Sequence, residues 1–214
     1  MSFDSLGLSE TVLKGIREMG YEDPTPIQLH GIPLILSGKD VIGSAQTGTG
    51  KTAAFGLPIL TRLDKPAQQP RALILEPTRE LASQVETAIQ DFSKFSKLRT
   101  TVLYGGVKYG RQTDALKAGT DIIVATPGRL LDHLSQKNTT LKHLEYLVLD
   151  EADRMLDMGF YDDIMKISNT LPKNRQTLLF SATMPPKIRE LANKLLKNPE
   201  SISLSISKPA KGIM

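Results

Sequence analysis

The sequence predicts an α/β fold, a parallel β-sheet with helices on both faces. Short segments that are continuously apolar recur along the chain, and most intervals between them carry apolar residues at helical spacing. Strands buried on both faces have this continuously apolar character, and parallel strands need long crossovers, usually helices. A glycine-rich loop also joins the first such strand to a helix. These observations together indicate one layered α/β domain.

The composition is that of a globular protein and narrows the class of function. The 214 residues, 40% of them hydrophobic, suffice for one substantial core with short appendages. The net charge of +4 suits a phosphate-rich partner but is too small to demand one. Cysteine is absent, which excludes disulfides and thiolate metal sites, and the histidines at positions 30, 133 and 143 lack ligand spacing. Without a signal segment or an apolar run of about 18 residues, we expect a cytoplasmic protein with no membrane partner.

The elements expected in chain order begin with two helices. The first is capped by Ser9 and ends at Gly20. The second begins at Thr25, with Pro26 in its first turn, and ends at residues 37–38. A further helix is expected over residues 53–63, after the glycine-rich loop. The expected strands are residues 40–43, 72–75, 101–104, 122–125, 146–149, 177–180 and 202–206.

The loop over residues 45–52, AQTGTGKT, has the pattern of a phosphate-binding loop. Glycines let the backbone point successive N–H groups at phosphate oxygens, and the following helix turns its positive end toward the same anion. A lysine then supplies a cation for the outer phosphates, and a threonine hydroxyl is placed to bind Mg²⁺. The alternative is a glycine-rich turn that only joins strand to helix. The nucleotide-binding residues expected here are Ala45, which replaces the usual first glycine, and Gln46, Thr47, Gly48, Thr49, Gly50, Lys51 and Thr52.

A second phosphate-site element is the apolar strand that ends in Asp150 and Glu151. A carboxylate at the carboxyl end of a parallel strand is well placed to bind Mg²⁺, which we assign to Asp150 together with Thr52. Glu151 can then polarise a water molecule for attack on the γ-phosphate. Many buried strands end in acidic residues without such a role, but the phosphate loop earlier in the chain favours the functional interpretation. The predicted catalytic residues are therefore Lys51, Asp150 and Glu151.

At this point the chain resembles a known family. Its motifs occur in the order of the DEAD-box ATP-dependent RNA helicases: AQTGTGKT (45–52), PTRELA (77–82), GG (105–106), TPGR (126–129), DEAD (150–153) and SAT (181–183). Upstream, GYEDPTPIQ (20–28) resembles the Q motif of that family, with Phe3 as its isolated aromatic residue. The resemblance covers essentially the whole chain. The combination of GGV with DRMLDMGF favours the bacterial RhlE-like branch.

The resemblance implies the N-terminal lobe of a two-lobed enzyme that uses ATP and Mg²⁺ to unwind or remodel RNA. Residues 1–36 would carry the Q motif, 37–206 the RecA-like core, and 207–214 the start of a linker to a second RecA-like domain. The second domain supplies arginine fingers in that family, so this lobe alone is expected to bind nucleotide and to be nearly inactive.

The resemblance also assigns adenine recognition to the Q motif. Gln28 offers a donor and an acceptor that match adenine N6 and N7, and Tyr21 can stack on the ring. Pro24 belongs to the same motif, whereas Phe3 is expected to pack the segment in place. The alternative for Gln28 is an exposed glutamine at a capped helix.

RNA contacts are expected at three turns that offer hydroxyls or N–H groups to a phosphodiester. These residues are Pro77, Thr78, Arg79, Gly105, Gly106, Thr126, Pro127, Gly128 and Arg129. Each turn alone could be an ordinary helix cap. Contacts of this kind touch the sugar-phosphate backbone, so binding should be insensitive to sequence.

The resemblance gives Asp153, Ser181 and Thr183 the role of coupling ATP state to RNA binding, and local strand-end capping is the alternative. Two rival functions remain open at this point. One is a phosphate-loop ATPase of another kind, such as a DNA translocase. The other is an ATP-gated RNA clamp or scaffold that does not unwind.

Overall fold

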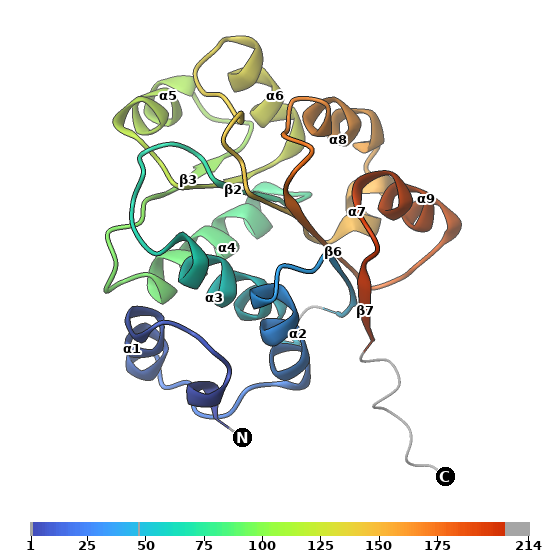
Figure 1. The fold of residues 1–214 in the computed structure, drawn as a ribbon. Coiled ribbons are helices and arrows are strands. Elements are labelled where there is room, and N and C mark those ends of the chain that lie inside the picture. The colour runs from blue at the N-terminus through green and yellow to red at the C-terminus, as the bar shows by residue number, and fades with distance from the viewer. Residues whose placement is uncertain (1, 47, 204–214) are drawn as a thin grey trace.

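The computed structural model describes residues 2–46 and 48–203. Within them, seven parallel strands form one sheet in the order β3-β4-β2-β5-β6-β1-β7, with helices on both faces (Figure 1). The predicted α/β class is therefore confirmed. The strands are β1 (Val41–Ser44), β2 (Ala72–Leu75), β3 (Thr100–Leu103), β4 (Ile122–Ala125), β5 (Tyr146–Leu149), β6 (Gln176–Ser181) and β7 (Glu200–Ser203).

The helices divide between the two faces of the sheet. Helices α1 to α4 share one core with alternate strand residues such as Ile74 and Val148, and α5 to α9 share the opposite core with Leu73 and Leu147. No helix of the described part of the chain is long and apolar enough to cross a bilayer. The helices are η1 (Phe3–Ser5), α1 (Glu10–Glu18), α2 (Pro26–Leu36), α3 (Lys51–Leu63), α4 (Arg79–Phe92), α5 (Tyr109–Ala118), α6 (Pro127–Ser135), α7 (Ala152–Asp157), α8 (Tyr161–Ser168) and α9 (Pro186–Leu195).

The two N-terminal helices begin where their capping residues predicted. The Ser9 hydroxyl accepts from the Val12 N–H at the start of α1, and Thr25 with Gln28 forms a reciprocal capping box at the start of α2. Both helices pack into the same core as α3 and α4. These segments are thus integrated into the sheet domain and are not an appendage.

The strand boundaries agree with prediction at β2, β4 and β5 and shift by one residue at β1 and β3. Strand β6 is one residue longer at each end than predicted, and β7 starts earlier, at Glu200, whose N–H donates to the Asp40 carbonyl at 2.8 Å. Pairing with neighbouring strands extends these elements past the apolar residues that marked them. The remainder of the predicted last strand and the linker at 207–214 lie outside the described residues.

Because every strand pair is parallel, the loops that follow the strands emerge at one edge of the sheet. The strand order sorts the motifs into two groups along that edge. The PTRELA, GG and TPGR motifs follow β2, β3 and β4, which are neighbours. The phosphate loop, DEAD and SAT follow or end β1, β5 and β6, which are also neighbours.

Candidate active site

The phosphate loop connects β1 to α3 and depends on glycine conformations. Gly48 and Gly50 have φ values of +87° and +82°, which favour glycine. A Cβ atom on Gly50 would also lie 2.5 Å from Gln28 Nε2, so a side chain there would collide with the Q-motif glutamine. Thr49 Oγ1 donates to the Gln46 carbonyl at 2.7 Å and tightens the turn. Thr47 lies outside the described residues.

Ala45, the residue that departs from the usual loop pattern, is buried at the start of this turn. Its N–H donates to the Ser181 carbonyl at 3.1 Å, which extends the pairing of β1 with β6 into the loop. The first loop residue is thus packed against the end of the neighbouring strand, where a small side chain fits.

The predicted catalytic residues meet in a buried ionic cluster. Lys51 Nζ lies 3.0 Å from Asp150 Oδ1 and also contacts Glu151 Oε2. The three side chains are only 8%, 3% and 8% exposed. Burial alone would lower the pKa of Lys51, but the adjacent Asp150 and Glu151 carboxylates outweigh it and raise the pKa above the ordinary value. The lysine is therefore held in its charged form between two carboxylates.

Glu151 also has an unusual backbone. Its φ of +55° places a non-glycine residue in the left-handed region as the N-cap of α7. Such conformations typically cost of order 1–3 kcal/mol and concentrate at functional sites. The strand β5 therefore turns abruptly into α7, and the turn places consecutive residues, Asp150 and Glu151, against one ammonium group.

Glu76 is a site residue that our sequence reading missed. It directly follows β2, its side chain is 0% exposed, and neither carboxylate oxygen has a hydrogen-bond partner of normal geometry among the described residues. Burial raises the pKa of Glu76 well above its ordinary value, and the charge of Asp150 raises it further. Its only sequence signal was an acidic residue immediately after an apolar strand, the same signal that identified Asp150.

The oxygen groups near Lys51 fit a magnesium ion that is also bound by phosphates. Asp150 Oδ1 is buried and, apart from the Lys51 ammonium, has no hydrogen-bond partner of normal geometry among the described residues. Thr52 stands half-buried at the start of α3. No group of three or more acidic or histidine side chains in the described chain could hold a metal ion by itself. Mg²⁺ often binds through one or two protein oxygens plus substrate phosphates, and Asp150 and Thr52 match that mode.

Gln28 is buried and connects the Q motif to the phosphate loop. Its Oε1 accepts from the Thr25 N–H at 2.9 Å, and its Nε2 donates to the Gly50 carbonyl at 3.1 Å. Gln28 belongs to the capping box at the start of α2, as the alternative interpretation expected. The side chain is 3% exposed, however, so the exposed glutamine of that alternative is not observed. An amide has two acceptor lone pairs and two N–H donors. One acceptor lone pair and one N–H donor of the amide are therefore not used by these two hydrogen bonds, and adenine recognition by Gln28 stays a prediction.

The aromatic residues of the N-terminal segment pack against one another. The Tyr21 ring lies 5.9 Å, centroid to centroid, from both Phe3 and Phe92. Phe3 is buried, whereas Tyr21 and Pro24 are half-buried. This arrangement supports the packing role expected for Phe3 and leaves part of Tyr21 available for stacking.

The three residues assigned to coupling are in direct contact. Asp153 Oδ2 accepts from the Thr183 hydroxyl at 2.9 Å and from the Thr183 N–H at 3.2 Å. The Ser181 hydroxyl accepts from the Asp153 N–H at 3.2 Å and donates to the Thr183 carbonyl at 2.7 Å. The DEAD turn after β5 is thus fastened to the end of β6, and the coupling role itself stays a prediction.

Two of the turns predicted to contact RNA are helix starts. Thr78 caps α4 by accepting from the Leu81 N–H at 3.2 Å, after the buried Pro77. Thr126 precedes α6, where Pro127 is the first helical residue and Gly128 the second. The N–H groups at both helix starts face the same edge of the sheet. They are the groups that the sequence proposed for phosphate contacts.

The third turn, at Gly105 and Gly106, lies beside two arginines. Gly106 has a φ of +84°, and a Cβ atom there would lie 3.8 Å from Arg79 Nη1. The guanidinium of Arg79 is exposed and stacks over the Tyr104 ring at 4.8 Å. Arg79 therefore presents a cation next to the glycine turn.

Arg129 has contacts inside the protein that the sequence did not predict. It was expected to add charge to an RNA contact, which stays a prediction, and its side chain is only 9% exposed. Nη2 donates to the Val107 carbonyl at 3.0 Å, and the guanidinium lies 4.2 Å from the Tyr109 ring. Arg129 thus holds the residue that follows the glycine pair. In this structure it positions the loop from within the protein.

Gln112 on α5 is the centre of this support and was also missed from sequence. Its Nε2 donates to the Tyr104 carbonyl at 3.0 Å, just before the glycine pair. Its Oε1 accepts from Arg129 Nη1 at 3.3 Å and lies 2.9 Å from His133 Nε2. Burial lowers the pKa of His133, with the Arg129 charge acting in the same direction, which favours a neutral ring. A single glutamine in a helical segment carries no sequence signal for such a role.

Comparisons with known proteins agree with this geometry. Residues 25–191 match the family model described as DEAD/DEAH box helicase. The chain is 50% identical over 204 residues to the ATP-dependent RNA helicase CshA of Limosilactobacillus reuteri, covering 95% of this chain and 41% of that protein. It is 46% identical over 208 residues to the ATP-dependent RNA helicase DeaD of Haemophilus influenzae, covering 97% of this chain and 34% of that protein.

A solved structure gives the same result. The crystal structure of a DEAD box protein from the hyperthermophile Methanococcus jannaschii has a TM-score of 0.92 and 42% identity, covering 97% of this chain and 57% of that one. The chain spans about two fifths or less of the length of the curated relatives above. Their names do not confirm the RhlE-like branch favoured from the sequence. With the family model, both relatives and the fold in agreement, the chain belongs to the DEAD/DEAH box helicase family.

Proposed function

We propose that this chain is the N-terminal lobe of an ATP-dependent RNA helicase that hydrolyses ATP to ADP and phosphate to unwind or remodel RNA duplexes. The observation that carries the proposal is the buried cluster of Lys51, Asp150 and Glu151 beside the phosphate loop. Burying a cation and two carboxylates carries a large desolvation penalty. A role in binding nucleotide phosphates would explain why these charged groups are placed here. The names of the relatives, which are ATP-dependent RNA helicases, support the same assignment.

Each residue of the cluster has a role in the proposed reaction. The Lys51 ammonium exchanges its carboxylate partners for phosphate oxygens when nucleotide enters the loop. Glu151, released from Lys51, accepts a proton from the water that attacks the γ-phosphate. Asp150 and Thr52 would hold Mg²⁺, which neutralises phosphate charge when it is bound. The Gln28 amide reads the adenine edge and reports its occupancy to Gly50 through the hydrogen bond between them.

RNA binding is proposed at the loops that follow β2, β3 and β4. The helix N-termini at Thr78 and Thr126 and the Gly105–Gly106 turn offer N–H groups to phosphates, and Arg79 adds an exposed cation. Only a few phosphates can be contacted, each contributing about −0.7 to the salt slope of single-strand binding. Binding by this lobe should therefore be weak, salt-sensitive and nearly indifferent to sequence.

The decisive experiment compares this chain with a two-lobed protein that includes the second RecA-like domain. We expect the chain alone to bind ATP and ADP but to release phosphate near the background rate, with or without RNA. Arginines supplied to a γ-phosphate are worth about 10³ to 10⁵ in rate in related enzymes. Here Arg154 directly follows the DEAD motif in sequence, and it lies exposed on α7. Equal RNA-stimulated rates in the two proteins would contradict the proposal.

An ATP-gated RNA clamp is the second candidate function. It would bind ATP and RNA through the same groups without separating strands. A strand-displacement assay with the two-lobed protein distinguishes the two, because a clamp would retain RNA in the presence of ATP and leave the duplex intact. A preference for DNA over RNA would instead favour a translocase.

A further inference from the structure

Strand β3 lies at one end of the sheet, and its outer edge is open. Among the described residues it pairs only with β4. The carbonyls of Arg99 and Leu103 point toward β4, since they accept from Asp121 N and Thr126 N, each at 2.9 Å. The alternation along a strand therefore directs the backbone groups of Thr100 and Val102 away from β4. These N–H and C=O groups are available to another strand.

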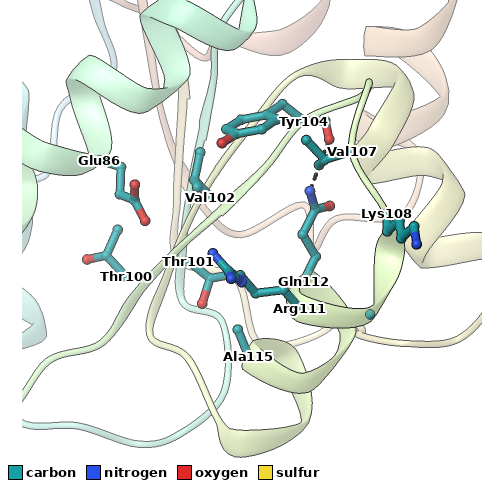
Figure 2. Close-up of a pocket in the computed structure, with 11 residues that line it drawn as sticks. Glu86, Thr100, Thr101, Val102, Tyr104, Val107, Lys108, Arg111, Gln112 and Ala115 are labelled. Atoms are coloured by element: carbon teal, nitrogen blue, oxygen red, sulfur yellow. Dashed lines mark hydrogen bonds between the residues drawn. The ribbon is translucent and has the colours of Figure 1, made fainter.

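A groove runs along this open edge, between α4 and α5. A cavity of about 570 Å³ lies against β3 between these helices, and a second of about 400 Å³ shares Thr100, Thr101 and Ala115 with it. Figure 2 shows the larger cavity, with Glu86 on the α4 side and Arg111 on the α5 side. We call this feature the edge groove and define it by Glu86, Thr100, Val102, Lys108, Arg111 and Ala115.

The two walls of the edge groove differ in chemistry. The α4 side carries Val102, which packs against the core shared by α1 to α4. It also carries Glu86, whose carboxylate would repel an acidic side chain of a ligand. The α5 side carries Lys108 and Arg111, and neither cation has a hydrogen bond or ion pair with another described residue. In addition, Thr100 Oγ1 is buried without a partner within the described chain. The groove thus offers one wall with an apolar residue and a carboxylate, one cationic wall, and unpaired polar groups.

We propose that the edge groove binds an extended peptide segment with alternating apolar and acidic side chains, which adds to β3 as a further strand. Side chains of a strand alternate between faces, so apolar residues would meet Val102 while acidic residues meet Lys108 and Arg111. Backbone hydrogen bonds to Thr100 and Val102 would supply affinity, and the two walls would supply specificity. This peptide site lies beyond the proposed helicase activity and does not depend on it.

Such a peptide would also touch the support of the glycine turn. Val107, Lys108 and Gln112 line the same cavity, and Gln112 holds the Tyr104 carbonyl. A bound segment would therefore lie against the groups that position a predicted RNA contact. This makes the edge groove a place where a partner protein could act on the RNA-facing loops.

The test uses a fluorescent heptapeptide of alternating glutamate and valine, together with the protein of residues 1–214. We expect anisotropy to report binding, and amide hydrogen exchange at Thr100 and Val102 to slow by about tenfold or more while Leu103 is unaffected. A lysine-for-glutamate peptide and a peptide N-methylated on the amides that would face β3 serve as probe controls. Both should bind at least about tenfold more weakly.

Arg111→Glu provides the protein control, because this exposed side chain has no described partner to lose. This substitution should weaken binding of the glutamate peptide by about tenfold and strengthen binding of the lysine peptide. Lys117→Glu, an exposed cation on the same helix but outside the groove, should change neither. The proposal would be overturned if the N-methylated peptide bound as tightly as the unmodified peptide. It would also be overturned if Arg111→Glu left the preference for the glutamate peptide over the lysine peptide unchanged. Protection of Thr100 and Val102 by a uridine decamer instead of the peptide would assign the groove to RNA.

Discussion

The two halves of the sheet edge use charged side chains in opposite ways. Beside β1, β5 and β6, the charges of Lys51, Asp150 and Glu151 face one another and are the proposed reactive groups. Beside β2, β3 and β4, Arg129 is turned into the protein to hold a loop carbonyl. What remains for a ligand there is mostly backbone N–H groups. The contacts of a charged motif residue therefore indicate whether it can act on a ligand or instead stabilises the conformation of a loop.

The largest expected effect tests the proposed catalytic residues beside β1, β5 and β6. Glu151→Gln should lower RNA-stimulated ATP hydrolysis by the two-lobed protein by about 10² to 10⁴, the usual contribution of a general base, while ATP binding stays nearly unchanged. Phosphate release and nucleotide titration measure the two quantities. Glu145→Gln, at the exposed far end of the same strand region, is the matched control and should have no effect. Wild-type turnover in Glu151→Gln would remove its assignment as the base.

Lys51→Met tests whether the ionic cluster is held together by its cation. It should abolish measurable nucleotide binding and lower the free energy of unfolding by about 3 to 5 kcal/mol, because two buried carboxylates lose their partner. Denaturant unfolding measures the loss. Adding Glu151→Gln should recover part of it, since one of the uncompensated charges is then removed. Additive losses in the double variant would mean that the cluster is not coupled as described.

Gln28→Ala tests the link between the Q motif and the phosphate loop. Loss of the amide should weaken ATP binding by about 1 to 3 kcal/mol and erode the preference for ATP over GTP. Competitive titration with both nucleotides gives the ratio. If wild type and variant discriminate equally between ATP and GTP, Gln28 supports the loop without reading adenine.

Gln112→Leu tests the supporting half of the comparison. Removing the amide that holds Tyr104 and Arg129 should weaken RNA binding by about 1 to 2 kcal/mol, equally for unrelated sequences, and leave ATP affinity unchanged. Arg129→Ala should behave the same way. Gln90→Leu, at an exposed position of α4, is the control. A loss limited to one RNA sequence would contradict a role through the backbone-contacting loop.

The last effect concerns Glu76 and appears as a dependence of stability on pH. Its pKa is raised in the folded chain by burial and by Asp150, so the folded state holds a proton that the unfolded state releases. The stabilisation that this proton provides is fully present at pH values below the pKa of Glu76 in the unfolded chain. It declines as pH rises toward the pKa in the folded chain, by at most about 1.4 kcal/mol per pH unit.

Glu76→Gln removes this slope. We expect the stability of wild type relative to the variant to fall as pH rises above the ordinary pKa of glutamate, as measured by denaturant unfolding at a series of pH values. A difference that stays constant with pH would mean that the Glu76 carboxyl is ionised in both states.

Several site residues could be recognised from sequence because their signals are local. The glycines and lysine of the phosphate loop, the Thr25 cap and the acidic end of β5 lie within a few residues of the structure that they form. Gln112 and Glu76 could not be recognised in this way. Their roles depend on partners in other segments: Gln112 supports Tyr104 and Arg129, and Glu76 lies beside Asp150.

The sequence by itself determined the α/β class, the capped N-terminal helices, nearly all the strands and the ordered motifs, because periodicity, caps and glycine turns act over neighbouring residues. Only the tertiary structure decided the strand order that separates β1, β5 and β6 from β2, β3 and β4 along one edge. It also decided that Arg129 is buried and that β3 has an open edge. These properties come from contacts between distant segments, and no local pattern specifies which crossover brings them together.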